Sequence, residues 1–301
     1  MSYDDFLRHF AQINRINGGT TELLSKHYEK FSYQINCKKR GIATVNTIKK
    51  YFQGDICGKK VLDIGCAYAG TSVAFAESGA SVIGVEISEA WLKLGLSHIE
   101  GYNNISLIHG DASSKKILSD LGSSYFDIVL LEDVFEHVYD TYSLLENIYM
   151  LTKQGSIIYF NIPNGYFPGN IASEVHKKIL GLSLVSPDRW ADFGVGSSFS
   201  IFYRPWEYYS TFLSKFRFSK IDRIWISKCQ SKSAGYIELS KQFLALLEAV
   251  QNSAYCNLLS SAFDNYKKLI EYDYLHCSDE EFSWKYLTPS WRGIVERADG
   301  M

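Results

Sequence analysis

The sequence lacks the features that mark several common classes of protein. Its six cysteines are scattered without a C-x-x-C pair, which argues against a zinc framework or a disulfide scaffold. No uninterrupted apolar run is close to the roughly 18 residues that are needed to span a membrane. The N-terminus, MSYDDFLRHF, does not have the basic and then apolar layout of a signal peptide. The formal net charge of -2 makes the chain no general binder of polyanions and disfavours nucleic acid. We therefore expect a cytoplasmic, reduced protein.

What is present is the composition of an ordinary globular chain. The 301 residues are 46% hydrophobic and 21% charged. Five short apolar runs at regular spacing predict strands that are covered on both faces, at residues 60–65, 81–87, 105–111, 126–132 and 156–163. Helix-length segments separate them, including one that begins at the capping residue Ser88. This alternation predicts an α/β fold with a doubly wound, mostly parallel, Rossmann-like sheet.

The domain organisation follows from the segments around these strands. Two more apolar runs, 220–227 and 235–240, bring the predicted sheet to seven strands. We expect an N-terminal helical cap over 1–54, the α/β domain over 55–240 and a C-terminal helical extension over 241–301, the last because its apolar residues recur with helical period. The irregular segment at about 164–204 is long for a connection and predicts an insertion that binds substrate. Its aromatic residues either line that site or pack in a core.

The turn GCAYAG, after the first predicted strand, indicates which ligand the sheet binds. Open parallel sheets bind ligands beyond the carboxyl ends of their strands. A dinucleotide needs G-x-G-x-x-G, whose second glycine lets the backbone approach the pyrophosphate. Ala67 stands at that position, so a nicotinamide-dependent oxidoreductase is disfavoured. Asp63, two residues before Gly65, would repel a pyrophosphate but suits a cofactor that carries an ammonium group and no phosphate.

Two further acids fit the same kind of cofactor. Glu86 ends the second predicted strand, 23 residues after Asp63, where a carboxylate accepts hydrogen bonds from both ribose hydroxyls. Asp111 ends the third predicted strand, where it can accept from the adenine amino group. S-adenosylmethionine combines an amino acid, a sulfonium, a ribose and an adenine. We therefore predict that it is the cofactor and that S-adenosylhomocysteine is its product.

Five ordered motifs resemble those of the class I S-adenosylmethionine-dependent methyltransferases. They are VLDIGCAYAG, GVEIS, GDA, FDIVLLEDVFEHV and GSIIYFNIPN, and the resemblance covers roughly residues 40–240. The turn departs from the family pattern, because the usual G-x-G-x-G reads G-x-A-x-A here. The resemblance implies a set of cofactor-binding residues at the motif positions, namely Asp63, Gly65, Cys66, Ala67, Gly70, Glu86, Ile87, Asp111, Ala112 and Glu132.

The segment EDVFEHV is predicted to face the methyl acceptor. His137 is the candidate general base, since the unperturbed pKa of histidine lies near neutrality, and the alternative is that it orders the turn. Ubiquinone-pathway O-methyltransferases and small-RNA 2′-O-methyltransferases carry E-x-x-E-H here, and in the RNA enzymes this signature binds a divalent ion. The resemblance therefore also implies a possible metal site at Asp133, Glu136 and His137, which we disfavour. No further histidine ligand is evident, because His176 reads as part of a surface helix.

The favoured function is transfer of a methyl group to the hydroxyl of a small molecule or a glycan, with Asp133, Glu136 and His137 as catalytic residues. One alternative is N-methylation of a small amine or of a nucleotide-linked amino sugar. Another is a non-catalytic protein that retains the cofactor fold and binds a partner. Residues 241–275 are the candidate surface for a homodimer.

Overall fold

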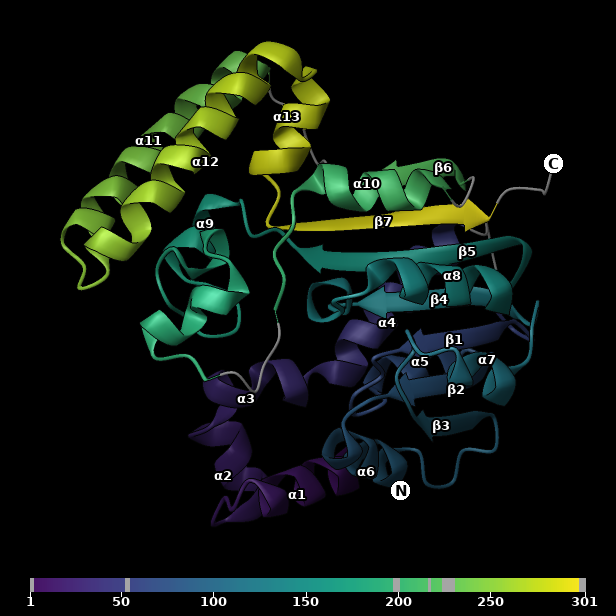
Figure 1. Cartoon of the computed structure of the whole chain (residues 1–301). Helices are drawn as coiled ribbons and strands as arrows, with labels where there is room; N and C mark the ends of the chain where they lie inside the picture. Colours follow the sequence, from purple (N-terminus) through teal and green to yellow (C-terminus); the bar gives the residue numbers. More distant parts are fainter. Residues whose placement is uncertain (1–2, 52–54, 197–200, 216–217, 224–230, 298–301) are drawn as a thin grey trace. The chain divides into compact units, whose positions relative to one another are not determined.

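The structure is a computed structural model that describes residues 3–51, 55–196, 201–215, 218–223 and 231–297 (Figure 1). The chain divides into two compact units. The first comprises Met1–Glu132, Tyr142–Tyr159 and Glu296–Met301, and the second comprises Asp133–Thr141 and Phe160–Val295. Among the described residues, no helix is both long enough and apolar enough to cross a membrane.

The first unit is built on a parallel sheet. Its strands are β1 (Lys60–Ile64), β2 (Ser81–Glu86), β3 (Ile105–His109), β4 (Phe126–Glu132) and the beginning of β5 (Thr152–Pro163). They lie in the order β3-β2-β1-β4-β5. Strand β1 pairs in parallel with β2 and β4, and Asp63 lies opposite Gly84 and Leu130. The predicted α/β Rossmann-like class is confirmed, as are the five strand positions, although β3 at the edge of the sheet is only partly buried.

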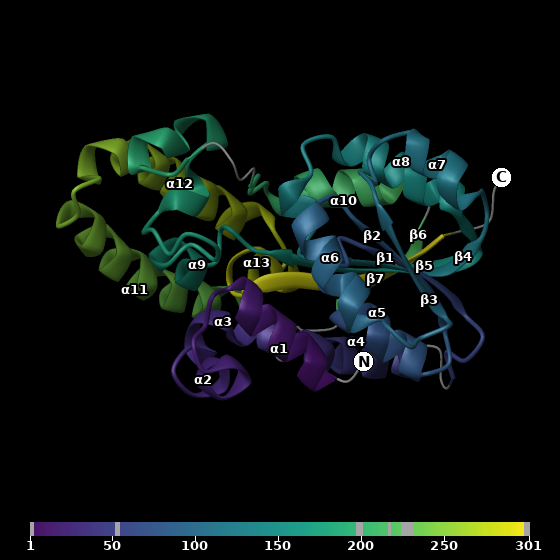
Figure 2. The same ribbon diagram turned by 90° about the horizontal axis from the view of Figure 1, so that it is seen from below.

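Helices cover both faces of this sheet (Figure 2). Helices α4 (Cys37–Tyr51) and α5 (Gly70–Glu77) lie on one face, and α7 (Lys116–Leu121) and α8 (Thr141–Leu151) lie on the other. Helix α6 (Glu89–His98) begins after Ser88, whose hydroxyl accepts a hydrogen bond from the backbone N–H of Trp91 as a capping residue does.

The N-terminal segment is helical, as predicted. It forms α1 (Tyr3–Ile13), α2 (Gly19–Ser25), α3 (Tyr28–Ile35) and α4. Helix α4 lies close to the start of α5. A Cβ atom added to Gly70 would be only 2.5 Å from the carbonyl carbon of Cys37. These helices therefore pack in the same compact unit as β1–β4.

The second unit combines a short piece of sheet with a helical layer. The end of β5 is followed in the sheet by β7 (Ser290–Arg297) and then by β6 (Phe218–Arg223), and β7 runs opposite to β5 (Figure 1). Its helical elements are η1 (Phe135–His137), α9 (Pro168–Ala172), η2 (Leu182–Leu184), η3 (Pro187–Phe193), α10 (Trp206–Lys215), α11 (Lys232–Gln251), α12 (Cys256–His276) and α13 (Asp279–Tyr286).

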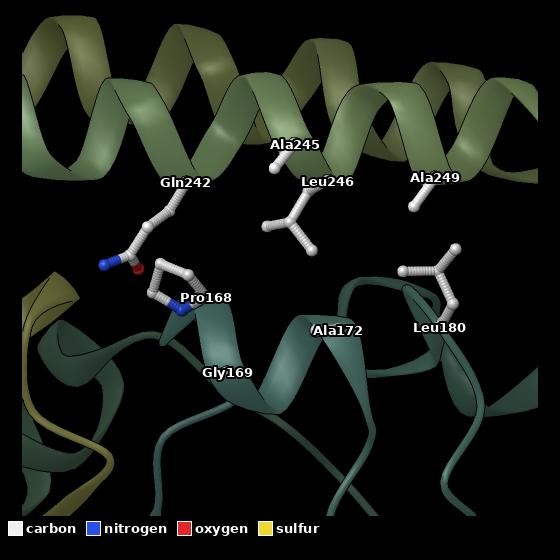
Figure 3. Close-up of a pocket in the computed structure, with 8 residues that line it drawn as sticks. All are labelled: Pro168, Gly169, Ala172, Leu180, Gln242, Ala245, Leu246 and Ala249. Carbon is white, nitrogen blue, oxygen red and sulfur yellow. The ribbon is translucent and has the colours of Figure 1, made fainter.

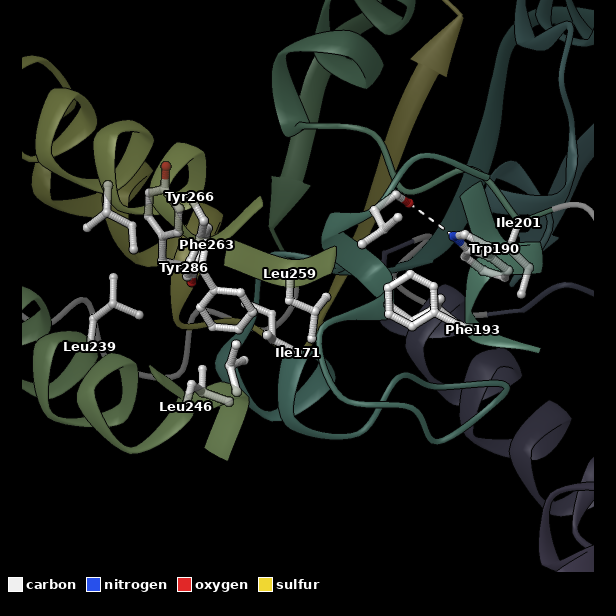
Figure 4. Packing of buried hydrophobic residues seen from close by; sticks show 14 of the residues in the cluster. Ile171, Trp190, Phe193, Ile201, Leu239, Leu246, Leu259, Phe263, Tyr266 and Tyr286 are labelled. Atoms are coloured by element: carbon white, nitrogen blue, oxygen red, sulfur yellow. Dashed lines mark hydrogen bonds between the residues drawn. The ribbon is translucent and has the colours of Figure 1, made fainter. Parts of the chain in front are cut away.

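A hydrophobic core joins the 164–204 segment to the C-terminal helices inside this unit (Figure 4). Trp190 is 3% exposed and its indole N–H donates to the carbonyl oxygen of Val185 at 3.0 Å. Phe193 and Trp206 are also buried. These aromatic residues therefore belong to a core, whereas Phe199 lies outside the described residues.

Two predictions about the later strands need correction. Residues 235–240 are not a strand but part of α11, where Gly235, Leu239, Leu246 and Val250 share one buried face at helical spacing. Strand β7 (Ser290–Arg297) was not predicted; half of its residues are buried and the rest are partly buried. The run at 220–227 overlaps β6, and residues 224–227 lie outside the described part of the chain.

Candidate functional site

The turn after β1 adopts a glycine-type conformation with alanines in it. The φ angles of Gly65, Ala67 and Ala69 are 69°, 46° and 59°, all in the left-handed region. An L-residue costs roughly 1–2 kcal/mol there, because Cβ approaches the following carbonyl oxygen. The backbone N–H of Ala69 donates to the carbonyl oxygen of Cys66 at 2.7 Å and closes the turn ahead of α5. The turn thus adopts the left-handed φ angles that glycine favours, although alanines occupy two of the three positions.

Asp63 is a buried acid at the end of β1. It is 3% exposed, and it accepts a hydrogen bond from the hydroxyl of Ser72 at 2.6 Å. Burial raises the pKa of its carboxyl group to about 7; the Ser72 hydrogen bond opposes this shift, and the charges of Glu132 and Glu86 add to it. A carboxyl group in this environment favours a cationic ligand, whose charge would lower the pKa again.

Glu86 connects the end of β2 to the turn. This buried carboxylate accepts from the backbone N–H of Ala67 at 2.9 Å and from that of Ser88 at 2.7 Å. The next side chain, Ile87, is 67% exposed. Because a carboxylate offers about four lone-pair positions, Glu86 can accept two further hydrogen bonds from a ligand.

The remaining acids follow β3 and end β4. Asp111 is exposed and accepts from the backbone N–H of Ser113 at 2.8 Å, while the carbonyl oxygen of Ala112 accepts from Asn147 at 2.9 Å. Glu132 accepts a hydrogen bond from the hydroxyl of Thr44 on α4. Since the carboxyl ends of parallel strands share one edge of a sheet, Asp63, Glu86 and Glu132 gather there, close enough to interact electrostatically.

Asp133 follows Glu132 directly and opens the second group of predicted site residues. Its φ is 56°, and its backbone N–H donates to the carbonyl oxygen of Asn161 at 2.9 Å. Its carboxylate accepts from the side-chain amide of Asn161, whose own oxygen accepts from Arg292 at 2.8 Å. A chain of hydrogen bonds from β5 and β7 thus fixes Asp133.

Glu136 is fully buried and poorly satisfied. Neither of its carboxylate oxygens has a hydrogen-bond partner among the described residues, and its Oε1 lies 3.7 Å from Nε2 of His137. Burial raises the pKa of Glu136 well above its usual range, and the nearby charge of Asp133 raises it further. Unsatisfied buried carboxylates are rare in folded proteins and are a recognised feature of functional sites.

His176 lies beside these residues, contrary to the prediction that it belongs to a surface helix. It lies in a turn after α9, and its ring centroid is 5.0 Å from that of His137. The ligand atoms of Glu136, His137 and His176 all lie within 4.8 Å of one another. The correction has a plain cause: SEVHKKIL resembles an amphipathic helix locally, and only tertiary packing reveals the pairing.

Glu174 holds His176 in place. This buried carboxylate lies 3.0 Å from Nδ1 of His176 and also accepts a hydrogen bond from the hydroxyl of Tyr203. Although burial alone would raise it, these hydrogen bonds and those from backbone N–H groups lower the pKa of Glu174 to about 2. Glu174 is therefore ionised and orients the imidazole beside it.

Comparison with known proteins gives one family for the central part of the chain. The sequence profile of a family described as "Methyltransferase domain" matches residues 62–160. Residues 62–160 therefore resemble a methyltransferase domain. The predicted resemblance to class I S-adenosylmethionine-dependent methyltransferases is confirmed.

Curated proteins that are similar to this part of the chain carry a shared name. A protein of Acinetobacter baumannii (strain ACICU) named "Ubiquinone biosynthesis O-methyltransferase" is 30% identical over 131 residues, which cover 42% of this chain and 55% of the relative. A protein of the same name from Pseudomonas fluorescens (strain SBW25) is 28% identical over 130 residues, with the same coverage of 42% and 55%. The chain thus spans about half the length of the curated relatives that it matches.

Solved structures give weaker likenesses. The arsenic(III) S-adenosylmethionine methyltransferase of Chlamydomonas reinhardtii is 25% identical, covers 36% of this chain and 39% of its own, and has a TM-score of 0.34. Phosphoethanolamine N-methyltransferase 2 of Haemonchus contortus, in complex with S-adenosyl-L-methionine, is 16% identical, covers 86% and 53%, and has a TM-score of 0.49. These TM-scores are too low to support a function.

Three residues that support the site were not predicted from the sequence. Thr44 and Ser72 donate to acids of the methyltransferase domain, and Glu174 orients His176. Hydroxyl residues at such positions carry no local signal, because their acceptors lie on other elements. The acid pattern at the strand ends, by contrast, is a signal that the sequence does provide.

A groove of about 410 Å³ lies in the second unit, between α9 and α11 (Figure 3). Pro168, Ala172 and Leu180 form one side, and Leu246 and its neighbours on α11 form the other. Gln242 is the polar side chain in this lining. The groove is thus mainly apolar.

Proposed function

We propose that the protein transfers a methyl group from S-adenosylmethionine. The observation that carries the proposal is the pair of buried acids, Asp63 and Glu86, at the ends of adjacent parallel strands inside a methyltransferase domain. In the proposal Asp63 attracts the ammonium group of the cofactor and Glu86 accepts from the two ribose hydroxyls. Asp111 accepts from the adenine amino group, and the exposed Ile87 packs against the adenine ring.

The other predicted cofactor residues supply backbone and shape. In the proposal the turn presents its main chain to the amino-acid part of the cofactor. Glu132 adds negative charge at the same edge of the sheet, and Thr44 holds it there. The backbone residues in question are Gly65, Cys66, Ala67, Gly70 and Ala112.

Calorimetric titration tests the cofactor directly. We expect S-adenosylmethionine and S-adenosylhomocysteine to bind the wild type, and Asp63→Ala to weaken binding at least about tenfold, or about 1.4 kcal/mol. Asp120→Ala is the matched control, since Asp120 is an exposed acid on α7. Absence of binding by the wild type, or equal affinity of Asp63→Ala, would contradict the proposal.

The proposed acceptor is a hydroxyl group of a small molecule or a glycan. Two points support O-methylation: the curated relatives are named for it, and the segment EDVFEHV supplies His137, an imidazole that can accept a proton. Displacement at a sulfonium requires alignment of the acceptor in line with the methyl group, and a hydroxyl must also lose its proton. His137 is about one-third exposed, so substrate can reach its imidazole.

N-methylation is the alternative that His137 distinguishes. A neutral amine attacks without prior loss of a proton, so it does not need His137 as a base. We expect methyl transfer to hydroxyl acceptors, measured by formation of S-adenosylhomocysteine, to fall about 100-fold in His137→Gln, within the usual range for a general base. Transfer to amines alone, unaffected by His137→Gln, would favour the alternative.

A second candidate mechanism uses a divalent cation. A buried carboxylate with two unsatisfied oxygens beside two imidazoles has the donor set of a site for Mn²⁺, Fe²⁺ or Zn²⁺. Glu136, His137 and His176 would hold the ion, and Glu174 would orient His176 as outer carboxylates do. A cation there would acidify the acceptor hydroxyl, and His137 would then be a ligand instead of the base.

Metal titration decides between the two mechanisms. We expect Mn²⁺ to bind the wild type in an equilibrium dialysis experiment and to bind His176→Ala at least about tenfold more weakly if the cation mechanism holds. His276→Ala is the matched control, because His276 is exposed on α12. If Mn²⁺ and Zn²⁺ bind neither protein, and chelators leave methyl transfer unchanged, the general-base mechanism stands.

Three broader predictions remain proposals. They are a cytoplasmic location, a role of the 164–204 segment in binding the acceptor, and a homodimer through residues 241–275. Leu244 on α11 and Leu275 on α12 are 65% and 73% exposed, which is consistent with a partner surface. Light scattering tests the dimer, and failure of every acceptor together with a stable partner complex would favour the non-catalytic alternative.

A further inference from the structure

We propose that the N-terminal helices hold the alanine-bearing turn in its left-handed conformation, with Phe10 and Tyr68 as positioning residues for the cofactor. A glycine turn adopts such φ angles by itself, whereas Ala67 and Ala69 need support from their surroundings. The cofactor part of this inference rests on the proposed function. The structural part concerns the turn alone.

The side chain of Tyr68 supplies the first link. Tyr68 lies between the two left-handed alanines, and its ring packs against the core of the N-terminal helices. Its centroid is 6.1 Å from that of Phe6 and 5.9 Å from that of Phe10, with Phe10 in an edge-on arrangement. The turn is thus anchored to α1 through an aromatic contact.

The backbone of Tyr68 supplies the second link. Its carbonyl oxygen lies 2.7 Å from Nδ1 of His98, and because a carbonyl can only accept, His98 donates this hydrogen bond. His98 is 2% exposed, and Phe6 stacks on its ring at 4.5 Å. Helix α1 therefore supports both the side chain of Tyr68 and the partner of its carbonyl group.

Close helix contacts supply the third link. A Cβ on Gly70 would lie 2.5 Å from Cys37 of α4, and a Cβ on Gly95 of α6 would lie 3.0 Å from the carbonyl oxygen of Ala67. The turn therefore has a helix against it on two sides. The close approach of α4 and α6 thus limits the space into which the turn could relax.

Glu86 connects the conformation of the turn to the proposed binding of the cofactor. The left-handed conformation of Ala67 directs its N–H to the Glu86 carboxylate at 2.9 Å. Relaxation of the turn would break this hydrogen bond and free the acid that we propose to bind the ribose. Loss of the support from α1 should therefore loosen the turn first, and weaker binding of the cofactor should follow.

Hydrogen exchange tests the turn without any ligand. In the full-length protein with Phe10→Ala, we expect the amides of Ala67 and Ala69 to exchange about tenfold faster than in the wild type. Phe263→Ala is the matched control, because Phe263 is as deeply buried but lies in the core of the second unit. Should Phe10→Ala fail to fold, Phe10→Leu keeps an apolar side chain there and removes the ring contact. Unchanged exchange at Ala67 and Ala69 in a folded Phe10 variant would overturn the inference.

A double-mutant cycle tests the link to the cofactor. We expect Phe10→Ala to weaken the binding of S-adenosylmethionine about tenfold. In that background, Ala69→Gly should restore the affinity to within about threefold of the wild-type value. The same glycine should improve affinity far less in the wild type, whose turn is already held. Equal effects of Ala69→Gly in both backgrounds would mean that α1 does not support the turn. If the wild type binds no S-adenosylmethionine, the proposed function fails, and the exchange rates still decide the inference.

Discussion

Replacing Asp63 by asparagine should make the protein more stable but weaken its binding of the cofactor. The asparagine side chain has nearly the same shape and could still accept from the Ser72 hydroxyl, but the substitution would remove a charge from a buried site. The pKa of Asp63 is about 7 in the folded protein, against about 4 for an ordinary aspartate. The folded state therefore holds this proton more tightly than the unfolded state.

The sign and the size of the effect follow from this difference. Because the folded pKa is raised, the stabilisation from the protonated carboxyl group is complete at low pH, falls as the pH rises from about 4 to 7, and is absent above. About three pKa units at 1.36 kcal/mol each give about 4 kcal/mol as an upper value. Asp63→Asn should approach this gain in the free energy of unfolding at pH 8 and show much less of it at pH 5.

Urea unfolding at pH 5 and pH 8 measures the effect, and a titration with S-adenosylmethionine measures its functional cost. We expect the cofactor to bind Asp63→Asn more weakly by about 2 kcal/mol, the usual value of a hydrogen bond to a charged group. Asp120→Asn, at an exposed position, should change neither quantity. Stabilisation that does not depend on pH, or an asparagine variant that is less stable at pH 8, would refute the reasoning.

The remaining predictions concern the same edge of the sheet. Ionisation of Asp63 should strengthen cofactor binding about tenfold between pH 6 and pH 8, with proton release in calorimetry performed in two buffers; a flat affinity would contradict this. Glu86→Gln should weaken the binding of the cofactor at least about tenfold, because an amide NH₂ cannot accept hydrogen bonds from ribose hydroxyls. Glu89→Gln, on the surface of α6, should have no effect on this affinity. Gly70→Ala should destabilise the protein by more than about 2 kcal/mol in thermal unfolding, since its Cβ would overlap α4, and Gly196→Ala, whose Cβ meets open space, should stay within about 0.5 kcal/mol.

The edge of the sheet that we propose for the cofactor has local determinants, so its acids could be located from the sequence. Asp63, Glu86 and Glu132 each end a strand that is recognisable from its own apolar run. Parallel pairing then brings the strand ends to one edge, as the registers of β1 with β2 and β4 confirm. The chemistry of the three acids therefore required no knowledge of long-range contacts.

The later part of the chain could not be predicted in the same way. Residues 235–240 have apolar residues in a pattern that is too short to separate a strand from a helix, and the twenty-residue length of α11 decided the outcome. Strand β7 follows three helices, and its pairing depends on β5, which lies far away in the sequence. Local propensity cannot anticipate a partner of that kind.

The same contrast separates the two halves of the proposed chemistry. The acids that we propose for the cofactor lie on β1, β2 and β4, whereas the group around Glu136 is completed by His176, Glu174 and Tyr203 from the 164–204 segment. A change in that segment can therefore remove an imidazole and its supporting carboxylate while leaving every cofactor contact in place. This is why the fold and the cofactor do not define the acceptor. The residues that distinguish a hydroxyl from an amine, or a base from a metal site, come from the part of the chain whose structure its sequence predicts least.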